Sequence, residues 1–309
     1  MFRPIHGEMI SSEFIFDKIN NELHVSRYIG NRKVVYVRDV IDIPITTIQS
    51  DSFTGMKETR IIVLDKHIKI IAEQAFRGLE HVTVYTPLSR ESVDFHEDGN
   101  QNVVFRYDLI GLHDIEFVLY ATFKDGTATI FDHHLLDNLY LSEGAYGEFL
   151  QLEDEVAGCK IVTIEPYALA YAYNVCRVLL PTHCVKIGRY GFHMNTSLES
   201  IWTNNELVEI SDYAFSSCKN LKDLVIEDSV AVMGKGVLSK SSIATIYTKR
   251  SNNTFAQEQF GVDTQIFTGF QDFRYQDGIE YACLTGNRAN LSDARRTRNE
   301  TVIVPDTIH

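Results

Sequence analysis

The chain has 309 residues, 44% of them hydrophobic, and its 42 acidic against 29 basic side chains give a net charge of -13 at pH 7. This composition suffices for a large core, and the negative charge argues against nucleic acid as a general partner, because an acidic surface repels phosphates. No apolar run approaches the roughly 18 residues that a membrane helix needs. Glu8 and Glu13 lie where a signal peptide would be apolar, so as written the chain is expected to stay cytoplasmic.

The N-terminal segment alternates apolar and polar side chains in three short stretches, residues 13–16, 23–28 and 33–37. Asn20-Asn21 and Gly30-Asn31, which separate these stretches, are turn-forming pairs. Alternation between turns predicts strands. We therefore expect residues 1–42 to form a three-stranded β-meander that caps the N-terminal end of the fold.

A fixed period of 23 residues dominates the chain. An isoleucine or methionine is followed five residues later by a large apolar side chain, at Ile48/Phe53 and Ile71/Phe76 and again at Ile164/Leu169, Ile187/Phe192, Ile210/Phe215 and Met233/Leu238. A period of this length indicates one small unit stacked repeatedly, within residues 43–88 and 161–250. Because a spacing of five suits neither a strand nor one helical face, we expect a short turn or 3-10 segment inside each pair.

Residues 89–160 keep the period only weakly. Val118/Phe123 and Leu141/Tyr146 fall on the same grid, but no clear strand pattern follows Phe123, and Leu135 to Leu152 could be helical. Two interpretations stay open for this region, degenerate repeats with an insertion or a separate inserted subdomain.

A second pattern follows each pair in the later repeats. Leu221, Leu224 and Ile226 match the L-x-x-L-x-L spacing of a leucine-rich repeat strand. The same places are held by Leu198, Ile201 and Thr203, by Val175, Val178 and Leu180, and by Ile243, Ile246 and Thr248. Since alternate side chains of a strand face opposite ways, these residues should face inward and those between them outward.

These units resemble BspA-like leucine-rich repeats, which are found in bacterial surface proteins and some protozoan ones. The resemblance covers about Ile43 to Pro87 and Ile161 to Lys249 and is carried by Ile210, Ala214, Phe215, Cys218, Leu221, Leu224 and Ile226, and by Ile71, Ala75, Phe76 and Leu79. It implies a single leucine-rich repeat solenoid, mainly β with short 3-10 turns and β-rich caps at both ends. It also implies adhesion or host-surface interaction, at the cell surface or after secretion.

Residues 251–309 return to the strand-and-turn style of the N-terminus. Asp277-Gly278 is a good hairpin turn. This region is expected to be a β-rich closing cap, with the opening of a second array as the alternative.

The outward positions of the later strands form the candidate binding site. They are Arg177, Leu179, Ser200, Trp202, Asn204, Asp223, Val225, Glu227, Thr245 and Tyr247, and an earlier repeat adds Ile61, Val63 and Asp65. The period places Trp202 between Leu179 and Val225, in an apolar stripe with a polar rim, which is the anatomy of a protein interface. The alternative is that a flanking segment covers Trp202.

Chemistry-bearing motifs are sparse. Asp132-His133-His134 follows an apolar run, as metal-binding residues do in some phosphoesterases, but the upstream D-x-D that such sites need is missing. The alternative places both histidines on a surface loop or helix start. The five cysteines are odd in number and contain no CxxC, so they are expected to be free thiols, with Cys218 facing the core.

The sequence thus predicts a non-catalytic module, without a cofactor, that binds a protein or an extended glycan through a concave sheet. A metal-dependent hydrolase built on Asp132, His133 and His134 is one alternative. A structural spacer without a dedicated partner is the other.

Overall fold

The structure is a computed structural model, and it describes residues 3–5, 8–10, 13–38, 43–95, 103–134, 149–243, 245–250, 255, 257–261, 265–276, 279–284 and 288–293. The chain divides into two compact units. The 23-residue period by itself predicts a single array. The first unit comprises residues 1–111 and 122–126, and the second comprises residues 112–121 and 127–309. Nearly all regular structure in the described ranges is strand, and the helices there are η1 (Arg90–Ser92) and α1 (Gln257–Phe260). Neither is long and apolar enough to cross a membrane.

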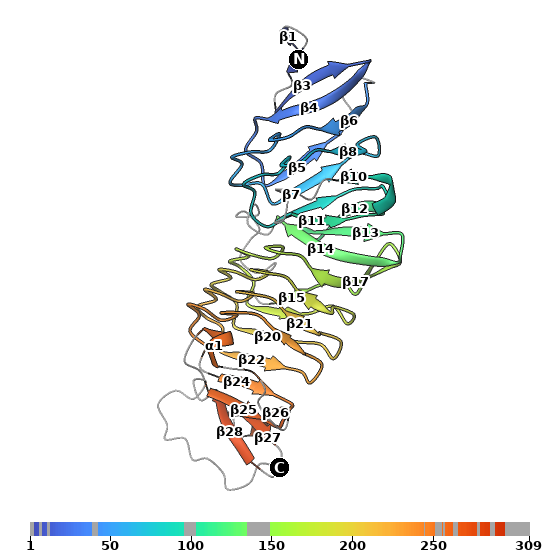
Figure 1. The fold of residues 1–309 in the computed structure, drawn as a ribbon. Coiled ribbons are helices and arrows are strands. Elements are labelled where there is room, and N and C mark those ends of the chain that lie inside the picture. The colour runs from blue at the N-terminus through green and yellow to red at the C-terminus, as the bar shows by residue number, and fades with distance from the viewer. Residues whose placement is uncertain are drawn as a thin grey trace. The chain divides into compact units, whose positions relative to one another are not determined.

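The first unit consists of two sheets of stacked short strands (Figure 1). One has the order β1-β2-β3-β4-β6-β8-β10 and the other the order β11-β9-β7-β5. The strands of the first sheet are β1 (Arg3–Ile5), β2 (Glu8–Ile10), β3 (Phe14–Ile19), β4 (Glu22–Tyr28), β6 (Ile45–Ile48), β8 (Ile70–Ile71) and β10 (Asp94–Phe95). Those of the second are β5 (Val34–Val37), β7 (Ile61–Leu64), β9 (Val82–Tyr85) and β11 (Val103–Arg106).

Two of the three strands predicted for the N-terminal meander pair with each other as expected, and the third does not join them. β3 and β4 form an antiparallel hairpin, and β1 and β2 extend it. The third predicted strand, β5, does not join them, because it pairs in parallel with β7 in the other sheet. The prediction therefore placed β5 in the wrong sheet. A solenoid needs such a crossing, since each turn of the chain contributes one strand to each side.

The second unit repeats the two-sided arrangement. One sheet has the order β12-β13-β14-β17-β19-β21-β23, and the other has the order β15-β18-β20-β22-β24-β25. The first is built from β12 (Leu109–Ile115), β13 (Val118–Phe123), β14 (Thr127–His133), β17 (Cys159–Ile164), β19 (Lys186–Ile187), β21 (Glu209–Ile210) and β23 (Val232–Met233), with β16 (Glu155–Val156) beside β17. The second is built from β15 (Phe149–Gln151), β18 (Arg177–Leu179), β20 (Ser200–Trp202), β22 (Asp223–Ile226), β24 (Thr245–Thr248) and β25 (Gln265–Thr268).

In the six regular repeats, which begin at Ile48, Ile71, Ile164, Ile187, Ile210 and Met233, the five-residue pair is joined by a turn, as predicted, and the turn has a fixed backbone conformation. The third residue after the isoleucine has a left-handed backbone in all six repeats, for example φ 55° at Gln74 and φ 57° at Tyr190. The chain then hydrogen-bonds to the next repeat, because Tyr190 N–H donates to the Asp212 carbonyl at 3.1 Å and Phe192 N–H to the Ala214 carbonyl at 2.8 Å. Turns of successive repeats are thus joined by backbone hydrogen bonds, as neighbouring strands of a sheet are.

The core of the second unit lies between its sheets. Val178, Ile201, Leu224 and Ile246 are paired in register on adjacent parallel strands and are all buried. The rings of Phe192 and Phe215 stack with centroids 5.3 Å apart. The chain is therefore a mainly β solenoid with 23-residue turns, as the period predicts.

One expectation for residues 89–160 is wrong, and a second is contradicted at its C-terminal end and untested over the rest. Val118 and Phe123 do not bracket a turn, because both lie within the continuous, buried strand β13. The proposed helix over residues 135–152 ends instead in a strand, β15, and its residues 135–148 lie outside the described residues. The pair Leu141/Tyr146 falls in that same undescribed stretch.

Candidate binding surface

The outward positions of β18, β20, β22 and β24 form what we call the outer strand face. Parallel pairing aligns Leu179 with Trp202, Trp202 with Val225 and Val225 with Tyr247. The register expected from the period is therefore confirmed. The side chains of Trp202 and Asp223 lie outside the described residues, so only their backbone positions are assigned.

The outer strand face is open at β18. Leu179 is 44% exposed although it lies in the middle of a sheet, and Arg177 beside it on the same strand is exposed too. Ser200 on β20 and Thr245 on β24 are half-buried. This end of the face therefore presents one large apolar side chain with a cation and a hydroxyl next to it.

The other end of the same face is covered. Val225 and Tyr247 are only 6% and 0% exposed, and they form a separate apolar cluster with Phe270 and Leu284. Phe270 belongs to β26 (Phe270–Gln276) and Leu284 to β27 (Ile279–Leu284), which form the C-terminal sheet with β28 (Arg288–Asp293).

The expectation that Val225 and Tyr247 are exposed is thus wrong. The physical reason is the packing of Phe270 and Leu284 against them, after a bend at Gly269, which has a φ of 71°. The Tyr247 ring then lies 5.3 Å from that of Phe270 and 5.7 Å from that of Phe267. The hairpin predicted for this region is present as β26 and β27, although Asp277 and Gly278 lie outside the described residues.

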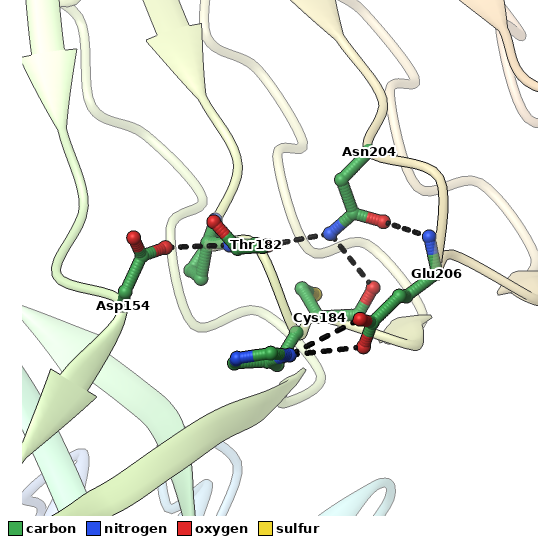
Figure 2. A network of polar contacts seen from close by, with 7 residues as sticks. Asp154, Thr182, Cys184, Asn204 and Glu206 are labelled. Carbon is green, nitrogen blue, oxygen red and sulfur yellow. Dashed lines mark hydrogen bonds and ion pairs between the residues drawn. The ribbon is translucent and has the colours of Figure 1, made fainter.

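Asn204 holds a loop together (Figure 2). Its Nδ2 donates to the carbonyls of Pro181 and Cys184, and its Oδ1 accepts the Glu206 N–H at 2.9 Å. Because every polar atom of the amide already has a partner in the chain, Asn204 contributes to the stacking of repeats. Its predicted role in binding stays a prediction, because the amide oxygen can accept a second hydrogen bond.

The same network continues through the neighbouring loop. His183 Nδ1 lies 3.1 Å from Glu206, and Asp154 accepts the Thr182 N–H at 2.6 Å. Glu227, another predicted site residue, pairs with Lys249 at 2.8 Å. These contacts join residues from successive repeats, which is what an array needs to hold its register.

In the first unit the corresponding outward positions are less open. Ile61 is buried, whereas Val63 and Asp65 are half-buried. The expectation that Ile61 faces solvent is wrong. Asp65 lies 3.4 Å from His67 Nδ1.

Asp132, His133 and His134 lie at the end of strand β14. Asp132 and His133 are buried, so the alternative that both histidines lie on a surface loop or helix start is wrong for His133. His133 Nε2 is 2.7 Å from the Ala170 carbonyl. Because consecutive side chains of a strand face opposite ways, Asp132 and His133 cannot converge on one ion. Among the described residues no group of three His, Cys, Asp or Glu side chains could hold a metal.

Sequence reasoning missed the hydrogen bonds that link repeats at the position eight residues after Ile187, Ile210 and Met233. Asn195 Nδ2 donates to the Leu169 carbonyl at 3.0 Å and Ser241 Oγ to the Phe215 carbonyl at 2.7 Å. Cys218 Sγ bonds the Phe192 carbonyl at 3.1 Å in the same way. The signal was present, since three small polar residues recur at the period, but the pattern alone did not distinguish them from core positions.

The thiols described in the structure are free, namely Cys159, Cys176, Cys184 and Cys218. Burial raises the pKa of both Cys184 and Cys218 to about 12. Cys218 faces the core as predicted. The side chain of Cys283 lies outside the described residues.

The family model for the BspA type leucine rich repeat region matches six copies in this chain, over residues 39–95 and 141–266. The chain belongs to the BspA-type leucine-rich repeat family. The match covers more than half of the sequence and includes both stretches in which the period is regular. No curated protein was found to match the chain.

Several solved bacterial structures are similar to this BspA-type chain. A leucine-rich repeat protein from Bacteroides capillosus is 22% identical, with 46% of this chain and 98% of that chain covered and a TM-score of 0.38. A leucine rich cell surface protein from Faecalibacterium prausnitzii is 14% identical over 85% of this chain and 98% of that one, with a TM-score of 0.31. The pneumococcal vaccine antigen PcpA is 12% identical over 87% and 93%, with a TM-score of 0.41.

Proposed function

We propose that this chain is a non-catalytic binding module that holds a protein partner on the outer strand face of its second unit. The observation that carries the proposal is the exposed Leu179, at 44%, on the open β18 end of that face. Single exposed apolar side chains also occur elsewhere on this chain, but Leu179 has a cation beside it on the same strand, and an apolar anchor with a polar rim is typical of protein interfaces.

The rest of the face supports this assignment. Arg177 and Ser200 provide the polar rim, and the C-terminal sheet covers the face at Val225 and Tyr247. A partner would therefore contact β18 and β20, next to the covered end. Trp202 lies in this stretch, between Leu179 and Val225 in the register, and is proposed as a further contact. The proposal places the working protein at the cell surface or outside the cell.

Binding to a panel of purified extracellular proteins and to a glycan array would test the proposal. Leu179→Ala and Arg177→Ala should each weaken a protein partner about tenfold or more, as expected for central contacts. Val208→Ala is a matched control, because Val208 is equally exposed, at 44%, but precedes β21 in the other sheet. A protein partner that is unaffected by both face variants, or weakened equally by the control, would disprove the assignment. Binding to glycans but to none of the proteins would show that the partner is a sugar polymer and not a protein.

A further inference from the structure

Three tyrosines form a stacked row on the turns of the second unit, outside the outer strand face. Tyr167, Tyr190 and Tyr213, here called the tyrosine ladder, each lie three residues after an isoleucine. The centroids of Tyr167 and Tyr190 are 4.8 Å apart, those of Tyr190 and Tyr213 are 5.2 Å apart, and both pairs are stacked. All three side chains are half-buried.

The backbone does not require tyrosine at this position. The equivalent residues in other repeats are Asp51, Gln74 and Gly236, with φ values of 60°, 55° and 56°. The tyrosines adopt the same left-handed conformation, which tyrosine favours no more than other side chains do. Three tyrosines in successive repeats therefore need an explanation other than turn geometry.

Two more aromatic side chains widen the ladder. The imidazole of His193 is edge-on to the rings of Tyr190 and Tyr171, at 5.2 Å and 5.5 Å. Tyr171 is 37% exposed. The aromatic surface thus extends across the turn as well as along the stack.

The charge on this surface is opposite to that of the whole chain. The Arg189 guanidinium lies over the rings of Tyr190 and Tyr213, at 5.2 Å and 5.8 Å. Lys235 and Lys240 lie at turn positions of the next repeat, are exposed, and form no ion pair with a described residue. Asp212, a carboxylate on these turns, accepts the backbone N–H of Lys235 at 2.8 Å. The turns that carry the ladder and the turn of the next repeat thus hold three cations against two carboxylates, Asp212 and the buried Glu165, in a chain of net charge -13.

We propose that the tyrosine ladder, with Arg189, Lys235 and Lys240, is a docking surface for an acidic segment of a second protein. Tyrosine and arginine are, with tryptophan, enriched in the hot spots of protein interfaces. Because the rings stack on one another, the faces between Tyr167 and Tyr190 and between Tyr190 and Tyr213 are occupied. Ring edges carry partial positive charge and therefore attract carboxylates, whereas a flat sugar ring would need an open face.

The test uses the full chain and immobilised synthetic peptides of equal length that are acidic, neutral or basic, with alginate as an anionic sugar polymer. The acidic peptides should bind best, and their affinity should fall as salt is raised, because charge pairs at a surface are screened. Arg189→Gln and Tyr190→Gln should each weaken this binding about tenfold. Glutamine is the matched replacement at Tyr190, since Gln74 already occupies the equivalent backbone position, and at Arg189 it removes the charge while keeping a polar side chain.

Three controls make the result specific. Gln74→Ala, on the equivalent turn of the first unit, should leave binding unchanged, and so should Leu179→Ala on the outer strand face. Tyr190→Phe keeps the stack and tests the hydroxyl alone, and thermal melting checks that each variant is folded. Equal binding of basic peptides, binding of alginate alone, no binding, or acidic binding that survives both glutamine variants would overturn the proposal. Because the variants differ from those of the proposed function, either proposal can fail without the other.

Discussion

Asn195 is the residue whose replacement tests the stacking of repeats most directly. Its side chain is buried and bridges to the preceding repeat, because Oδ1 accepts the Ala172 N–H at 2.8 Å and Nδ2 donates to the Leu169 carbonyl at 3.0 Å. Asn195→Ala removes both bonds and leaves two backbone groups without partners. Each unsatisfied buried group costs about 1–3 kcal/mol, so we expect a loss of about 2–6 kcal/mol.

The chain itself supplies the matched control. In a later repeat Ser241 makes the same two contacts with a smaller side chain, accepting the Cys218 N–H at 3.0 Å and donating to the Phe215 carbonyl at 2.7 Å. Asn195→Ser should therefore restore most of the lost stability, with a remaining cost of roughly 1 kcal/mol from the missing packing volume.

Two measurements check this prediction. Urea unfolding followed by circular dichroism gives the free energy, fitted to the transition of the second unit because an array with two units need not unfold in one step. Native-state hydrogen exchange at the Ala172 amide should show lost protection in Asn195→Ala and retained protection in Asn195→Ser. If the serine variant is as unstable as the alanine variant, or if alanine costs less than about 1 kcal/mol, the side-chain bridge does not stabilise the stack.

Three further predictions concern the core and the thiols. Phe215→Ala removes a fully buried ring that stacks on Phe192, and it should destabilise the second unit by about 3–5 kcal/mol in the same urea assay; an unchanged midpoint would disprove the register. The thiols should react unequally, because the pKa of Cys184 and Cys218 is raised to about 12 whereas Cys176 is half-buried. At pH 8 iodoacetamide should modify Cys176 before Cys184 and Cys218, as mass spectrometry of the native protein would show, and equal labelling of these three thiols would contradict the burial. The raised thiol pKa also makes the free energy of unfolding depend on pH. The thiol contribution is fully present below about pH 8.5, where cysteine titrates in the unfolded chain. Above that pH the free energy of unfolding falls as the pH rises toward 12, by up to about 1.4 kcal/mol per pH unit for each thiol. Urea midpoints at pH 8 and pH 10 would measure that fall, which should be smaller in Cys218→Ser.

The sequence by itself determined the repeating part of this protein. The 23-residue period identified the solenoid, the inward rows of Val178, Ile201, Leu224 and Ile246, and the alignment of Leu179 with Trp202. These features were predictable because parallel strands in an in-register stack place equal positions of successive repeats side by side, so a spacing in the sequence becomes a neighbour in space.

Only the tertiary structure decided what lies against the stack. Alternation sent Val225 and Tyr247 outward correctly, yet the C-terminal sheet buries them through Phe270 and Leu284. No local pattern encodes that contact, because it joins a periodic repeat to a C-terminal segment that does not follow the period. The alternation of a strand defines which way a side chain points but not what covers it. The same holds for β5, which reads as the third strand of a meander but finds its hydrogen-bonding partner in β7.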